Sequence, residues 1–164
     1  MPPRPPHPAP RPPPAAPVPP AGDAPAGDAP DYPALAAFRH ALRGFTAFSE
    51  AQAHAAGLTP RQHQALLAIK GGAGAERVSV GDLARQLLIR PHSTGELVDR
   101  LVQLGLVERQ EDPEDHRRAL LRLTARAEAI LHELSAAHLR ELRAVRPTLL
   151  ALLRRFGPSG PEAE

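Results

Sequence analysis

Residues 83–124 decide the fold, and they read LARQLLIRPHSTGELVDRLVQLGLVERQEDPEDHRRALLRLT. Near the middle, Pro91 suits the first position of a helix, where its missing N–H would have no partner in any case. Residues at three- and four-residue steps then predict the buried face of this helix: Thr94, Leu97, Val98, Leu101 and Leu104. Gly105 is expected to end the helix, because glycine readily adopts the left-handed conformation found there.

A shorter helix is predicted just before it. Ser79 and Asp82 have the spacing of a capping box, in which each side chain accepts a hydrogen bond from the backbone of the other residue. Its buried side is predicted to consist of Leu83, Ala84 and Leu87. Two short helices joined by residues 88–90 are typical of a helix-turn-helix motif, whose second helix enters the major groove of DNA.

A hairpin is predicted after the second helix. Residues 106–109 and 119–123 have the composition of short strands, and the polar segment 111–116 between them is expected to form the turn. A helix-turn-helix followed by a hairpin is a winged helix-turn-helix. The expected fold is therefore mainly α with a small β-hairpin wing.

The helical period continues on both sides of this motif. Upstream, a helix is expected from residue 34 with one apolar stripe, formed by Leu35, Phe38, Leu42, Phe45 and Phe48. Thr59 and Pro60 predict the start of a second helix, which Gly71 and Gly72 would end. Downstream, Thr124 is expected to cap a long helix, and Pro147 to begin a last one.

The composition divides the chain near residue 33. Residues 1–33 hold 15 of the 21 prolines and little to bury, which predicts a disordered arm; residues 157–164 are expected to be a flexible tail. The two arginines and three aspartates of the arm, with the two glutamates of the tail, hide a net charge of +5 on residues 34–156 behind the overall +2. A mildly basic folded part is compatible with binding a polyanion.

Several classes of protein are disfavoured by composition. The chain has no cysteine, which excludes disulfides, cysteine-based redox sensing and cysteine-ligated zinc. Its eight histidines show no paired metal-ligand spacing, and no phosphate loop or nucleophile elbow is present, so we expect neither a metal site, a cofactor nor an enzyme. No apolar run is long enough for a membrane helix or a secretion signal, so we expect a cytoplasmic protein.

Residues 35–156 resemble the MarR family of bacterial winged helix-turn-helix transcriptional regulators. The resemblance rests on several local sequences in the family's order: LTPRQ from Leu58, SVGDLA from Ser79, PHST from Pro91, LVDRL from Leu97 and GLV from Gly105. The most specific match is the wing, where DPEDHRR from Asp112 leads into LRLT from Leu121.

The resemblance implies a homodimer that binds double-stranded DNA at a pseudo-palindromic operator. Residues 34–56 and 125–156 would be dimerisation helices, and residues 58–124 the DNA-binding part. The many apolar residues of the terminal helices agree with this implication, because a small monomer has little need of them.

In the family, an aspartate in the wing orients an arginine that enters the minor groove of DNA. The matching residues are Asp115 and Arg117. A planar guanidinium suits a narrow, electronegative minor groove, which agrees with this role. The alternative is a solvent-exposed turn whose charges pair only with one another. Arg118 is a candidate for a phosphate contact.

The outward face of the second helix of the motif offers further candidates. The backbone amides after Pro91, with Ser93, are suited to a phosphate, and His92 to a phosphate or a base edge. Glu96 can accept a hydrogen bond from cytosine, although it also repels phosphate. Gly95 and Glu96 depart from the family, which often has a hydroxyl residue and a basic residue there. Arg100 is a candidate for the DNA backbone or for a pair within the protein.

The sequence thus predicts a DNA-binding transcriptional regulator, and by family habit a repressor released by a small-molecule effector of unknown identity. The alternative is a winged helix that contacts another protein and does not read DNA. Effector-binding residues vary too much among relatives to be transferred to this chain.

Overall fold

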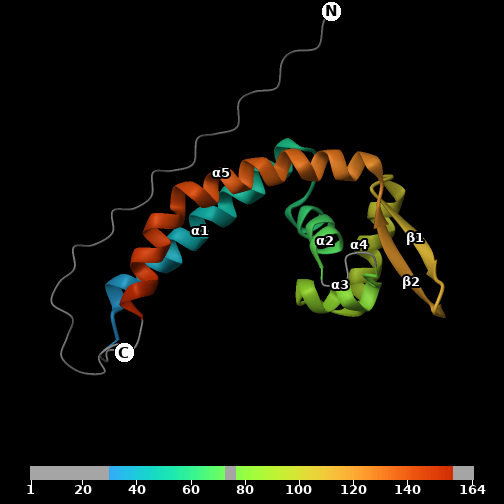
Figure 1. Ribbon diagram of the computed structural model, residues 1–164, viewed down its shortest axis with the longest axis horizontal. Helices are drawn as coiled ribbons and strands as arrows, with labels where there is room; N and C mark the ends of the chain where they lie inside the picture. Colours follow the sequence, from blue (N-terminus) through green and yellow to red (C-terminus); the bar gives the residue numbers. More distant parts are fainter. Residues whose placement is uncertain (1–29, 73–76, 157–164) are drawn as a thin grey trace, which may run out of the picture. The chain divides into compact units, whose positions relative to one another are not determined.

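The computed structural model describes residues 30–72 and 77–156, apart from the side chains of His116 and Arg117. Most of the proline-rich arm and the C-terminal tail therefore lie outside the described residues. The described part contains the helices and strands α1 (Tyr32–Ala55), α2 (Pro60–Gly71), α3 (Val80–Leu87), α4 (Pro91–Gln103), β1 (Val107–Asp112), β2 (Asp115–Leu123) and α5 (Ala125–Arg155) (Figure 1). This mainly helical order with one two-stranded antiparallel hairpin confirms the predicted fold class.

The chain divides into two compact units. One, here called the winged unit, is Gln52–Ala136; the other, the terminal-helix unit, is described over residues 30–51 and 137–156. Helices α1 and α5 each contribute residues to both units.

Capping residues set where the helices of the winged unit begin. The Thr59 side chain accepts from the backbone N–H of Gln62 at 3.2 Å, and the Gln62 side chain accepts from that of Thr59 at 2.8 Å. Ser79 and Asp82 form the same reciprocal pair at the start of α3. Thr124 accepts from the N–H of Ala127 at 3.3 Å at the start of α5. The predicted caps are thus confirmed, because each depends only on neighbours along the chain.

The core of the winged unit is formed by the inward faces of its helices together with the base of the hairpin. Its largest fully buried side chains are Leu66, Ile69, Val78, Leu83, Val98, Leu101, Leu106, Val107 and Leu121. Leu131 and Leu134 of α5 complete it. Leu104 was predicted to be buried, but it is 45% exposed, since α4 ends at Gln103 and Leu104 is its C-cap, followed by Gly105 at φ +65°.

The strands of the hairpin are longer than the sequence indicated. Residues expected in the turn belong to β1 and β2, and only Pro113 and Glu114 connect them. From Val107↔Leu123 to Glu111↔Ala119 the pairing is regular, but Asp112 then pairs with Asp115. Residues 116–118 of β2 therefore form a bulge. With this bulge, the charged residues at the end of the hairpin still belong to the two strands, up to the tight turn at residues 113–114.

The terminal-helix unit contains α1 and the later part of α5, joined by aromatic and polar contacts. The rings of Phe45 and Phe48 meet that of His138 edge to face, and Phe38 meets Phe156 in the same way. His138 Nε2 lies 2.8 Å from the hydroxyl of Ser49. Helix α1 begins at Tyr32 and not at residue 34, because the Asp31 side chain accepts from the N–H of Ala34 at 3.0 Å.

The separate last helix expected from Pro147 was a wrong prediction. Pro147 lies inside α5, which continues to Arg155. Proline removes one hydrogen bond from a helix and crowds the preceding turn. The helix continues because contacts hold it on both sides of the proline. His138 contacts α1 before the proline, and after it Arg155 contacts Asp31, which directly precedes α1, while Phe156 contacts Phe38 of α1.

Among the residues that the structure describes, Leu88 is the one with a positive φ that is not a glycine. It ends α3 at φ 54° and ψ 40°, and 92% of its surface is exposed. A left-handed conformation costs a residue with a Cβ about 1–2 kcal/mol, and exposure gives no compensating burial. The chain therefore has a locally unfavourable residue in the turn that leads into α4.

We expect Leu88→Gly to raise the free energy of unfolding by about 0.5–1 kcal/mol, because the relief of the left-handed conformation exceeds the added entropy of the unfolded chain. Urea denaturation measures the change. Leu67→Gly, at a partly exposed position inside α2, is the matched control and should lower the stability. An L88G chain no more stable than the parent would contradict this account of Leu88.

Candidate nucleic-acid interface

Helices α3 and α4 are joined by a turn of fixed backbone geometry. The N–H of Ile89 donates to the carbonyl of Ala84 at 3.1 Å, and the N–H of Leu88 to that of Arg85 at 3.3 Å. Pro91 then takes the first position of α4, as predicted. The turn at residues 88–90 therefore holds the start of the second helix at a defined place relative to the first.

Burial of one face of α4 determines which side chains face outward. Thr94, Leu97, Val98 and Leu101 are buried, and the Thr94 hydroxyl is satisfied by the carbonyl of Arg90 at 3.0 Å. The exposed face carries His92, Glu96, Asp99, Arg100 and Gln103. This polar face is the one expected from the sequence to face DNA.

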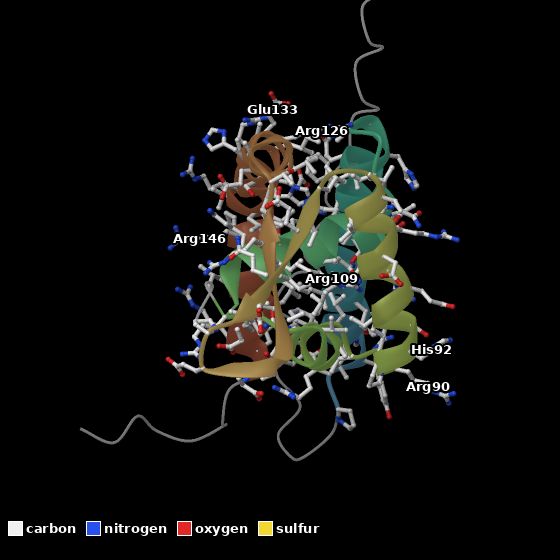
Figure 2. All side chains as sticks on the ribbon, turned by 90° about the vertical axis from the view of Figure 1, so that its right-hand side faces the viewer. Arg90, His92, Arg109, Arg126, Glu133 and Arg146 are labelled. Carbon is white, nitrogen blue, oxygen red and sulfur yellow. The ribbon has the colours of Figure 1, made fainter. Side chains whose placement is uncertain are left out.

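The N-terminus of α4 has no side-chain cap. The N–H of Thr94 donates to the carbonyl of Arg90 at 3.0 Å, and Pro91 has no N–H. The amides of His92 and Ser93 precede the first helical hydrogen bond and point out of the end of the helix. Ser93 is half-buried beside them, and Arg90 and His92 project from the same end (Figure 2).

Arg90 was not among the candidate residues expected from the sequence, where it was only part of the connection between the helices. It is exposed at the N-cap position of α4, next to the free end of the helix. A basic residue directly before a helix-starting proline is the signal that could have identified it.

The acidic residues of α4 have basic neighbours. His92 Nε2 lies 3.5 Å from the Glu96 carboxylate, one turn along the helix, and Asp99 accepts from Arg109 of β1 at 2.7 Å. Arg100 is exposed. At Gly95 an added Cβ would meet nothing within 4 Å, so the helix surface is open to close approach there.

The residues predicted at the wing have different surroundings in the structure. Asp115 is exposed at the start of β2, opposite Asp112. The backbone of Arg117 lies in the bulge, while its side chain is outside the described part. Arg118 does not stand alone: its Nη2 lies 3.1 Å from the Asp82 carboxylate at the start of α3.

The buried charge of the wing was also missed. Asp112 has a side chain only 1% exposed; it accepts from the N–H of Glu114 at 3.0 Å and from Arg77 Nη2 at 3.2 Å. Arg77 also reaches Glu114 at 2.7 Å. The Glu114 amide and Arg77 hold the pKa of Asp112 below its ordinary value, and Arg77 lowers the pKa of Glu114. The pKa of Asp82 is lowered by its hydrogen bonds from Ser79, then by Arg85 and Arg118.

These carboxylates are therefore charged at neutral pH and fixed by partners. No sequence signal pointed to Arg77, because it lies 35 positions from Asp112 along the chain.

Two helices joined by a short turn and followed by a bulged hairpin define a winged helix-turn-helix protein. Within the described residues, no helix is long and apolar enough to span a membrane, and no group of three or more His, Asp or Glu residues is placed to hold a metal ion.

Comparison with known proteins shows which family the chain is similar to. The MarR family model matches residues 56–118. A MarR family transcription regulator of known structure is 28% identical, with a TM-score of 0.59 over 80% of this chain and 93% of that one. MepR, a transcription regulator of the Staphylococcus aureus multidrug efflux pump MepA, is 17% identical, with a TM-score of 0.61 over 72% of this chain and 84% of that one.

Wild-type MarR from E. coli, in its apo form, is 22% identical, with a TM-score of 0.57 over 73% of this chain and 93% of that one. None of the curated proteins matches the chain. The chain is similar to the MarR family over residues 56–118 and has the fold of MarR family transcription regulators of known structure.

Proposed function

We propose that this chain is a transcriptional regulator that binds double-stranded DNA in a sequence-specific way as a homodimer. The observation that supports this most directly is α4. This helix buries one face and leaves a polar face exposed. Its N-terminus has uncapped amides beside Arg90 and His92. A helix with free N-terminal amides and basic side chains at the same end is suited to entering a groove lined by phosphates.

We propose a role for each candidate residue of the winged unit. The amides of His92 and Ser93 would bind a phosphate, and Gly95 would let the helix surface approach the base edges. Glu96 would accept a hydrogen bond from a cytosine. In the free protein, where no phosphate is bound, His92 lies beside Glu96. A MepR mutant has been solved bound to an oligodeoxyribonucleotide, which supports the same use of the fold here.

The wing residues complete the proposed DNA contact. Arg117 would enter the minor groove from the bulge of β2, and Asp115 would orient it. Arg100 would contact the DNA backbone beside the major groove. Arg118, held by Asp82 in the free protein, would lie next to the neighbouring phosphates.

The terminal-helix unit supports a second copy of the chain as partner. Its two helices expose apolar side chains that a two-helix unit alone cannot cover: Leu35, Leu42, Leu139, Leu142, Leu150 and Leu153. Many exposed apolar side chains on so small a unit are characteristic of an oligomer interface. A two-fold dimer would present two copies of α4 to a pseudo-palindromic operator.

We further propose that the regulator is a repressor, and that a small-molecule effector releases it by favouring a dimer whose two α4 helices no longer match the half-site spacing. This proposal rests on the family resemblance.

A mobility shift with the DNA upstream of the protein's own gene, at two salt concentrations, tests DNA binding. We expect retention at low salt and a marked loss at higher salt, because phosphate contacts release counterions. An unrelated fragment of equal length should be retained less. Absence of retention at low salt would overturn DNA binding and favour a winged helix that contacts a protein, as the acidic Glu96 and Asp99 on the exposed face would permit.

A further inference from the structure

The segment just before α3 is joined to the wing. The carbonyl of Val78 accepts from the N–H of Leu121 at 2.8 Å, and Ser79 pairs with Leu120 as an isolated bridge. Arg77 directly precedes this junction. Its side chain reaches Asp112 and Glu114, at the far end of the hairpin.

Asp112 links Arg77 to the wing. Its buried carboxylate accepts the N–H of Glu114 and thereby fixes the turn at residues 113–114. On the opposite strand, Asp112 pairs with Asp115, which directly precedes the bulge at residues 116–118. The hydrogen bond from Arg77 therefore holds the point at which the bulge begins.

A second ion pair also joins the wing to the residues around the start of α3, but here the basic residue belongs to the wing. Arg118 of the wing contacts Asp82 of α3, whereas Arg77 before α3 contacts Asp112 of the wing. Between them lies an open hollow of about 350 Å³ lined by Arg77, Val78, Asp82, Arg85, Gln86 and Arg118. Around this hollow, the two ion pairs and the bridge at Ser79 are links that join the wing to the start of α3.

We propose that Arg77 is a positioning residue for the wing: through Asp112 it fixes the turn and the bulge, and so the direction in which Arg117 leaves the strand. Arg77 does not contact DNA in this account. The inference rests on the proposed DNA binding, and it adds a residue outside α4 and the hairpin to the determinants of DNA affinity.

A double-mutant cycle with Arg117 distinguishes positioning from direct contact. We expect Arg77→Ala to weaken binding to the upstream fragment by about tenfold, similar to the loss of one DNA-contacting arginine. In a chain that already carries Arg117→Ala, the same substitution should change affinity less than about twofold, because its effect passes through Arg117. Equal losses in both backgrounds would show that Arg77 contacts DNA itself and would overturn the proposal.

Glu114→Gln is the matched control. It removes the charge of the exposed partner of Arg77 but leaves the link to Asp112, so affinity should stay within about twofold of the parent. Thermal unfolding of each variant shows whether it is folded at the assay temperature.

Limited trypsin digestion tests the same inference without DNA, since trypsin cleaves after Arg117 and Arg118 in the wing. Cleavage there should be several-fold faster in Arg77→Ala than in Glu114→Gln, because local opening exposes the bulge. Equal cleavage rates would overturn the positioning role even if the parent chain binds DNA. If the parent binds no DNA but the wing of the variant is cleaved faster, the proposed function fails and the role of Arg77 in holding the wing stands.

Discussion

Leu139→Glu combined with Leu142→Glu should convert the chain from a dimer to a monomer. Both leucines are exposed on α5 within the terminal-helix unit. In a two-fold dimer each substitution occurs twice at one interface, so four like charges would have to be buried. An unpaired buried charge costs several kcal/mol, more than such an interface can tolerate.

The same variant should lose about 10²–10⁴-fold in operator affinity, because two half-sites are then bound by separate molecules. Light scattering after size-exclusion chromatography gives the mass, and the mobility shift gives the affinity. Leu67→Glu, a similarly exposed leucine on α2, is the control and should leave the mass unchanged. A variant that remains dimeric would place the interface elsewhere.

Arg117→Ala should weaken operator binding by about 1–3 kcal/mol, which is roughly 5- to 150-fold, and lower the salt dependence by about one counterion. The reason is that a guanidinium in the minor groove contributes both its charge and its fit to a narrow, electronegative groove. Titrations at several salt concentrations measure both quantities.

Arg61→Ala controls for the loss of one positive charge, because Arg61 is exposed on α2, outside α4 and the hairpin. Its effect should be several-fold smaller. If Arg117→Ala has the same affinity and the same salt dependence as the parent, the wing has no part in the mechanism of DNA binding.

The parts of the fold that depend on near neighbours were predictable. Thr59, Ser79 and Thr124 cap helices with residues three positions away, and Gly105 ends α4 because its φ is positive. The buried stripe of α4 followed from its period. The error at Pro147 has the opposite origin, because contacts with α1, distant in the sequence, override the local preference of proline to start a helix.

The place of the candidate site residues in the fold was predictable where the family's motif is contiguous, and their partners were unpredictable where charges meet across the fold. The sequence pointed to His92, Ser93 and Asp115 by their place in local motifs. It did not reveal that Asp82 holds Arg118, or that Asp99 holds Arg109. Such pairs depend on strand register and on the bulge at residues 116–118, and neither leaves a signature in composition or period.

The continuation of α5 past Pro147 has a consequence for how the terminal-helix unit opens. Beyond the proline, one hydrogen bond to the preceding turn is missing, so the last residues depend on Arg155, 2.7 Å from Asp31, and on Phe156 against Phe38. Asp31 in turn caps the first turn of α1. Fraying at either end removes the support of the other. The start of α1 and the end of α5, although far apart in the sequence, therefore form one cooperative element in local unfolding.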